Sequence, residues 1–177
     1  MGCNPAENAP MAAGGTKSWW HRVFGRQTWQ EALQAGSSPV KICRLVGRHV
    51  AYRHGSSDGW CRGEAVWSRK WADCAGFASC VWEMCRSAGV DAAVRLYYST
   101  GCPGLGHAVV VGRSGATTWI SSNGCYERFE DDAEALVWVA RQMSWSVPQT
   151  WCRPLEDEEV RALIAKGSHE VRGNHKA

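Results

Sequence analysis

The sequence lacks any apolar run long enough to cross a membrane. Its longest, residues 135–140, covers six positions, whereas a spanning helix needs about 20. The N-terminus has no charged-then-apolar signal pattern, which favours a cytoplasmic location and leaves a virion-associated one open. With 20 basic and 17 acidic residues the net charge is only +3, too small to indicate a nucleic-acid or membrane-surface partner. We therefore expect neither partner.

Motifs for metals and cofactors are missing as well. The chain has no Cys-x-x-Cys pair, no two histidines at helical spacing, no P-loop and no dinucleotide fingerprint. Its nine cysteines are an odd number in a chain without a signal pattern, so a complete disulfide framework is not expected. Most of them are expected to be reduced core residues. The sequence thus predicts a protein that needs no metal and no cofactor.

The sequence does contain enough apolar bulk for one folded domain. Hydrophobic residues make up 45% of the 177 positions and charged residues 21%, as in an ordinary globular protein. Eleven of the residues are Trp. Most are expected to fill the core, with an aromatic groove for a peptide or sugar as the alternative. We expect a flexible arm at residues 1–17, one domain at 18–166 and a flexible polar tail at 167–177.

Local patterns predict the order of helices and strands. Helices are expected from residue 18, over 28–36, 74–89, 131–143 and 154–166, and strands over 94–98, 107–112 and 117–121, while residues 40–52 fit either. The centre of the chain therefore reads as one helix followed by an antiparallel meander, with further helices on both sides. That order predicts an α+β fold in which helices pack on an antiparallel sheet.

Three residues in this central region suit nucleophilic chemistry. Cys74 opens a helix directly after Asp73, where unpaired backbone N–H groups favour the thiolate and could hold an oxyanion. His107 begins a strand after a Gly-rich loop, in position to take the thiol proton. Asn123 follows the returning strand, from which a carboxamide could orient the imidazole. Each residue alone also fits an ordinary structural role, in the core, at a cap or in a turn. Their order and spacing together predict a Cys-His-Asn triad.

The same segments resemble a known family. Residues 71–78 resemble the nucleophile motif of transglutaminase-like cysteine peptidases of the papain-like superfamily, in which Asp-Cys-x-x-Phe/Tyr-Ala opens the helix. Residues 94–98 and 106–111 are similar to that family's first strand and to its Gly-His-Ala-Val strand. Where the family commonly has Asp or Asp-Asn, this chain has Ser122-Asn123. Asn123 is taken as the third catalytic residue, since a serine would orient a histidine only weakly.

The resemblance implies a fold, a reaction and a substrate class. It implies a papain-like core and a cysteine hydrolase or acyltransferase acting on amide bonds of a protein or peptide, with Trp71 as a candidate for lining the oxyanion pocket. NlpC-type cell-wall peptidases share the Asp-Cys-x-Gly-Phe pattern, which makes peptidoglycan a further candidate substrate. The alternative is an inactive papain-like module that binds a partner, for instance through the N-terminal arm, or serves structurally in a phage or bacterial assembly.

Overall fold

A five-stranded antiparallel sheet separates two groups of helices. The computed structural model describes residues 27–54 and 59–173, with side chains up to residue 167. The helices are α2 (Trp29–Ala35), α3 (Pro39–His49), α4 (Gly63–Arg69), α5 (Cys74–Ser87), α6 (Asp132–Gln142) and α7 (Asp157–Gly173), with a 3₁₀ turn at Val147–Gln149. The sheet strands are β3 (Ala92–Ser99), β4 (Gly106–Ser114), β5 (Thr117–Ser122), β6 (Cys125–Phe129) and β7 (Thr150–Leu155).

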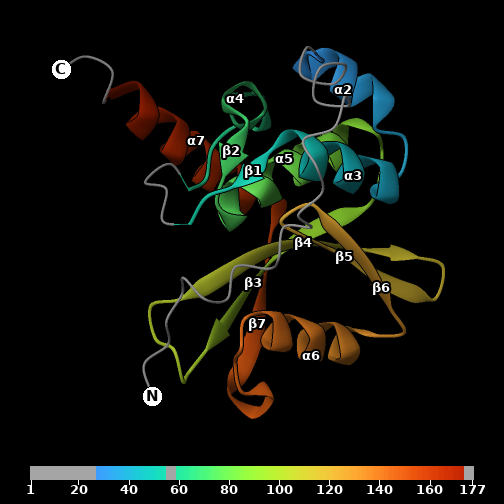
Figure 1. Ribbon diagram of the computed structural model, residues 1–177, viewed down its shortest axis with the longest axis vertical. Coiled ribbons are helices and arrows are strands. Elements are labelled where there is room, and N and C mark those ends of the chain that lie inside the picture. The colour runs from blue at the N-terminus through green and yellow to red at the C-terminus, as the bar shows by residue number, and fades with distance from the viewer. Residues whose placement is uncertain (1–26, 55–58, 174–177) are drawn as a thin grey trace, which may run out of the picture.

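The sheet has the order β6-β5-β4-β3-β7, so β4 lies at its centre. All four strand pairs are antiparallel. Helices α2 to α5 gather on one side of the sheet and α6 lies on the other (Figure 1). A separate parallel pair, β1 (Ala51–Tyr52) with β2 (Trp71–Ala72), leads into the start of α5. The α+β expectation, with a helix at Cys74 packed on an antiparallel sheet, is confirmed.

Side-chain caps begin three of the helices where the sequence places them. Thr28 and Glu31 form a reciprocal capping box at α2. The Asp73 carboxylate accepts the Gly76 N–H at the start of α5, at 3.0 Å. At α6 the Asp131 carboxylate accepts two backbone N–H groups, each at 2.9 Å. Each cap satisfies donors that the first turn of a helix leaves unpaired, which is why these helix starts could be predicted from local sequence.

The two faces of the sheet bury separate cores, because side chains alternate along a strand. On β4, Ala108 and Val110 join the large core beneath α5, while Val109 and Val111 join the smaller core beneath α6. The large core also takes in the apolar side of α7 through Val160 and other residues. This alternation decides which residues of β4 face the nucleophile helix.

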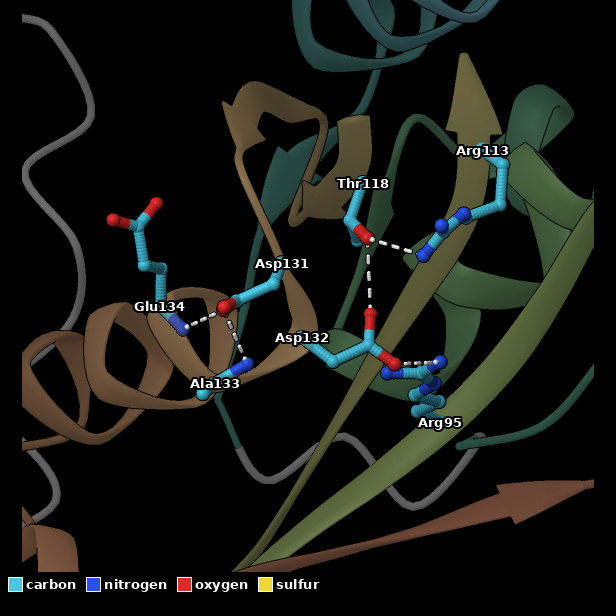
Figure 2. Close-up of polar contacts among 7 residues, drawn as sticks. All are labelled: Arg95, Arg113, Thr118, Asp131, Asp132, Ala133 and Glu134. Carbon is cyan, nitrogen blue, oxygen red and sulfur yellow. Dashed lines mark hydrogen bonds and ion pairs between the residues drawn. The ribbon is translucent and has the colours of Figure 1, made fainter. Parts of the chain in front are cut away.

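Polar contacts fasten the start of α6 to the sheet (Figure 2). The Asp132 carboxylate accepts hydrogen bonds from Arg95 of β3 at 2.8 Å and from Thr118 of β5 at 3.0 Å. Arg113 of β4 donates in turn to the Thr118 hydroxyl at 3.4 Å. Arg95 lowers the pKa of the Asp132 carboxyl, chiefly through this hydrogen bond. One carboxylate therefore ties the helix to β3 and β5, and Arg113 of β4 joins this network through Thr118.

Replacing Asp132 with alanine is expected to lower the free energy of unfolding by about 1 kcal/mol. The variant loses two hydrogen bonds and leaves Arg95, which is only partly exposed, without its carboxylate. Urea unfolding at pH 7 measures the change. Glu158→Ala, which removes a carboxylate from an exposed ion pair on α7, is the matched control and should stay within about 0.5 kcal/mol of wild type. Equal effects of the two substitutions would contradict this account.

Several elements differ from the sequence-based expectation. Residues 40–52, which fit either a helix or a strand, form α3 and then β1. Strands β6 and β7 and helix α4 were not expected. The helix expected at 154–166 begins at Asp157 and runs to Gly173, because Pro154 lies in edge strand β7, where proline is tolerated. Residues 167–173, expected to belong to a flexible tail, are therefore part of α7. The expected N-terminal arm and the helix expected from residue 18 lie outside the described residues.

Within residues 27–54 and 59–173, none of the helices combines the length and the apolar character that a membrane crossing requires.

Candidate active site

Cys74 is the first residue of α5, as expected. Its half-buried side chain packs against the large core. The hydrogen bond from Gly76 to Asp73 fixes the first turn, whose other leading backbone amides have no partner within the helix. Tyr52 of β1 lies nearby: burial raises the pKa of its hydroxyl to about 12, with further contributions from the charges of Cys74 and Asp73. Nothing in the sequence distinguished Tyr52, because it reaches the site only through the β1–β2 pair.

Burial and backbone donors act on the Cys74 thiol in opposite directions. Burial raises its pKa and outweighs the lowering effect of hydrogen bonds from the backbone amides of Ala108, Ala75 and Cys74 itself. The thiol is therefore protonated at neutral pH, while the three backbone amides favour its thiolate form. Two donors come from the helix start and the third from β4, one residue after His107. Backbone amides that favour a thiolate can also stabilise negative charge that develops during a reaction.

His107 is buried near the start of β4 and is 4% exposed. Its Nε2 lies 2.8 Å from the Ser122 Oγ of β5. Burial lowers the pKa of the imidazole from 6.5 to about 4, so the ring is neutral at pH 7. A bond at Nε2 leaves Nδ1 as the nitrogen that could exchange a proton with a thiol. No hydrogen bond joins His107 to Cys74 in the part of the chain that the structure describes.

Strand alternation gives the relative placement of the two residues. Tyr97, which pairs with His107 in the β3–β4 ladder, belongs to the core beneath α6, and His107 shares that face. Ala108, whose backbone amide lowers the pKa of Cys74, points to the α5 face. By strand alternation, His107 therefore starts on the opposite face of β4 from the α5 core that contains Cys74.

The structure differs from the expectation at the third position. Ser122, rather than Asn123, holds His107, because Ser122 lies on the same sheet face as Ile120 and the α6 core. Asn123 and Gly124 form the turn between β5 and β6, with φ values of 50° and 79°. The side-chain oxygen of Asn123 is buried and has no hydrogen-bond partner among the described residues.

Trp71 lies at the start of β2, three residues before Cys74, and is partly buried. Its ring packs against two guanidinium groups, with the Arg53 and Arg69 carbons 4.9 and 4.6 Å from the ring centre. Arg69 also donates to the Trp71 carbonyl at 2.8 Å. These cation–π contacts account for the ring's position without a role in an oxyanion pocket.

The other thiols are poor candidates for chemistry. Burial raises the pKa of Cys43 to about 11 and that of Cys85 to about 12, and it raises the pKa of Cys80 well above its ordinary value. Buried, protonated thiols of this kind are inert. Cys125, in contrast, is exposed on β6.

Among residues 27–54 and 59–173, no group of three or more His, Cys, Asp or Glu side chains could hold a metal ion.

No protein-family model matches the chain, and no curated protein matches it either. The family resemblance therefore depends on the residues around Cys74, His107 and the β5 strand alone.

Proposed function

We propose that the protein is a papain-like cysteine enzyme that acts on amide bonds of a protein or peptide. The position of Cys74 at the start of α5, where the backbone amides of Cys74, Ala75 and Ala108 of the His107 strand favour its thiolate, is the observation that supports the proposal most directly. Ser122 is the positioning residue for the imidazole. No cofactor enters the proposed reaction.

In the proposed reaction the Cys74 sulfur attacks the carbonyl carbon of the amide while the thiol proton passes to Nδ1 of His107. The amides of Cys74, Ala75 and Ala108 donate to the oxyanion of the tetrahedral intermediate. As the C–N bond breaks, His107 returns the proton to the departing amine and a thioester remains. Water then gives a peptidase or deamidase, and an amine gives a transglutaminase. Because His107 and Cys74 are both neutral at rest, the proton moves during attack and not before it.

A second candidate is an inactive module of the same fold that binds a partner. Two observations favour it: no hydrogen bond joins the thiol and the imidazole within the described ranges, and alternation starts His107 on the α6 face of β4. In that case the bond between His107 and Ser122 is structural, and Cys74 is a core residue at a helix start.

Alkylation by iodoacetamide between pH 4 and 9, mapped by mass spectrometry, separates the two candidates. If His107 acts as a general base, the Cys74 rate should rise with the neutral imidazole, near pH 4, and then stay level up to the alkaline rise of the thiol. His107→Ala should remove this level region and lower the Cys74 rate at pH 6 by about 100-fold, within the usual range for a lost general base.

Two internal references accompany the measurement. Exposed Cys125 reports on the reagent, and buried Cys80 reports on unfolding. Labelling of Cys125 should not change in His107→Ala, and Cys80 should stay unlabelled. A Cys74 rate that is no higher than that of Cys80, or one that His107→Ala leaves unchanged, would contradict catalysis and favour the binding module.

A further inference from the structure

An exposed aromatic pair lies on edge strand β7 and its neighbour β3. Trp151 of β7 is 47% exposed, although tryptophan is highly buried on average in folded proteins. Its ring stacks on that of Tyr98 in β3, with the ring centres 4.7 Å apart and the planes at 28°. The two residues are direct partners in the β3–β7 ladder. We call this pair the Tyr98–Trp151 platform.

Strand alternation places the platform on the face of the sheet that α5 covers. On β3, Val94 belongs to the large core beneath α5 and Leu96 packs against it, and Tyr98 is the next residue on that face. On β7, Leu155 belongs to the same core, four residues after Trp151. Because side chains two residues apart point to the same face, both rings lie on the α5 face.

Burial decreases along this face of β7 toward Trp151. Leu155 is 3% exposed. Arg153, two residues earlier in the chain, is exposed and pairs with Glu159 in the first turn of α7 at 2.9 Å. Trp151, a further two residues earlier, is the most exposed large apolar side chain among the described residues. The outer surface of its indole is therefore open to solvent.

The β4 strand connects the platform with the nucleophile. Tyr98 pairs with Gly106, and a Cβ on Gly106 would lie 3.1 Å from the Tyr98 ring, so this ring lies against β4 directly before His107. Ala108 follows on the same face, about 7 Å along the strand. Ala108 and Cys74 pack in the same core, and the Ala108 amide lowers the pKa of Cys74. The platform therefore adjoins the candidate active site.

The surroundings of the platform favour a neutral, planar group. Two offset rings present a flat surface on which a third ring can stack. The charges at its border, Arg153 and Glu159, compensate each other in an ion pair, so they attract neither a cation nor an anion strongly. A single exposed apolar side chain is ordinary on a protein surface, but this indole is held by a second ring and lies beside a candidate nucleophile.

We propose that Trp151, held in place by Tyr98, is a substrate-binding residue that stacks a neutral aromatic side chain of the peptide whose carbonyl reacts at Cys74. This inference rests on the proposed function and specifies its substrate: a peptide with a phenylalanine or tyrosine close to the reacting amide is preferred over one with an aliphatic residue of similar size. Trp151 lies two strands from β4, about 10 Å across the sheet, within reach of such a side chain.

A pair of alkylating probes tests the proposal on the intact protein. N-(3-phenylpropyl)-2-iodoacetamide carries a planar ring, and N-(3-cyclohexylpropyl)-2-iodoacetamide carries a puckered ring of similar bulk on the same linker. Both react by forming the S–C bond as iodide leaves, and the thiol proton goes to His107 or to water. We expect the phenyl-to-cyclohexyl rate ratio at Cys74, divided by the same ratio at exposed Cys125, to be about 5, the effect of one aromatic pair.

Variants of the platform identify the contact. Trp151→Ala should bring the normalised ratio to about 1, whereas Trp151→Phe keeps a ring and should retain most of it. Val147→Ala removes another exposed apolar side chain, and as the matched control it should leave the ratio unchanged. Buried Cys80 should stay unlabelled in every variant, which shows that each remains folded. A wild-type ratio of about 1, or a ratio that survives in Trp151→Ala, would overturn the proposal.

The same data separate this inference from the proposed function. If His107→Ala leaves both rates at Cys74 unchanged while the ratio still depends on Trp151, the platform binds aromatic groups beside a thiol that catalyses nothing. If His107→Ala slows both probes but the wild-type ratio is about 1, the reaction stands and the role of the platform falls.

Discussion

Acidification from pH 7 to pH 4 is expected to remove about 3 kcal/mol of stability through His107 alone. The folded chain holds this imidazole at a pKa of about 4, against 6.5 without burial, and each unit of difference corresponds to about 1.4 kcal/mol. Between these values the unfolded chain binds a proton that the folded chain does not, so protons favour unfolding. The stabilisation is complete above pH 6.5 and is lost as the pH falls through 4.

Urea unfolding of wild type and His107→Gln at pH 7 and pH 4 measures this loss. Glutamine does not titrate, so the variant should lose about 3 kcal/mol less than wild type over the same interval. Carboxylates such as Asp132, whose pKa is lowered by its bond to Arg95, titrate in both proteins and cancel in the difference. Equal losses in the two proteins would show that His107 is not buried as a neutral ring.

Replacing Gly112 with alanine is expected to lower the free energy of unfolding by about 3 kcal/mol. Gly112 lies inside β4, and a Cβ there would overlap the Trp119 indole and come within 2.6 Å of the Asp91 carbonyl oxygen. Trp119 is fully buried, so neither the ring nor the backbone can move aside at low cost. Urea unfolding and thermal melting at pH 7 both report the change.

Gly59→Ala is the matched control, because the nearest atoms to its Cβ would lie 3.8 Å away or farther. Its stability should stay within about 0.5 kcal/mol of wild type. A Gly112→Ala protein as stable as this control would mean that Trp119 does not pack against β4 as described. Since β4 also carries His107 and Ala108, the Gly112 variant should in addition disturb labelling of Cys74.

Local signals account for what the sequence could predict. The helix caps at Thr28, Asp73 and Asp131 involve contacts within four residues, so both partners of each contact lie in one short stretch of sequence. The strand pair 107–112 and 117–121 was recognisable from apolar residues on either side of a tight turn. These elements carry Cys74 and His107 and form the larger part of the candidate site.

Tertiary contacts determine the structural features that local sequence patterns did not predict. Pro154 reads as the first turn of a helix by local preference, yet it lies in edge strand β7. Gly112 reads as the end of a strand, but the strand continues to Ser114 because the glycine makes room for Trp119. Helix α4 follows Arg62, which provides no side-chain cap, so its start left no local signal.

Tertiary context also decides whether Ser122 or Asn123 is the hydrogen-bond partner of His107. Chemistry favours the carboxamide as a partner for His107, because it is the stronger acceptor. Register decides otherwise: residues 118, 120 and 122 of β5 share the face that His107 occupies on β4. The sequence pattern alone does not distinguish two strand registers that differ by one residue.

The sheet order has a consequence for how the chain is made. Strand β3 pairs with β4 on one side and with β7 on the other, although Thr150 follows Ser99 by 51 positions (150 − 99). A nascent chain that has emerged only as far as β6 therefore presents β3 as an open edge with unpaired backbone groups. Open edges of this kind recruit strands from other molecules. The chain is therefore most prone to aggregation during biosynthesis, before β7 and α7 have been made.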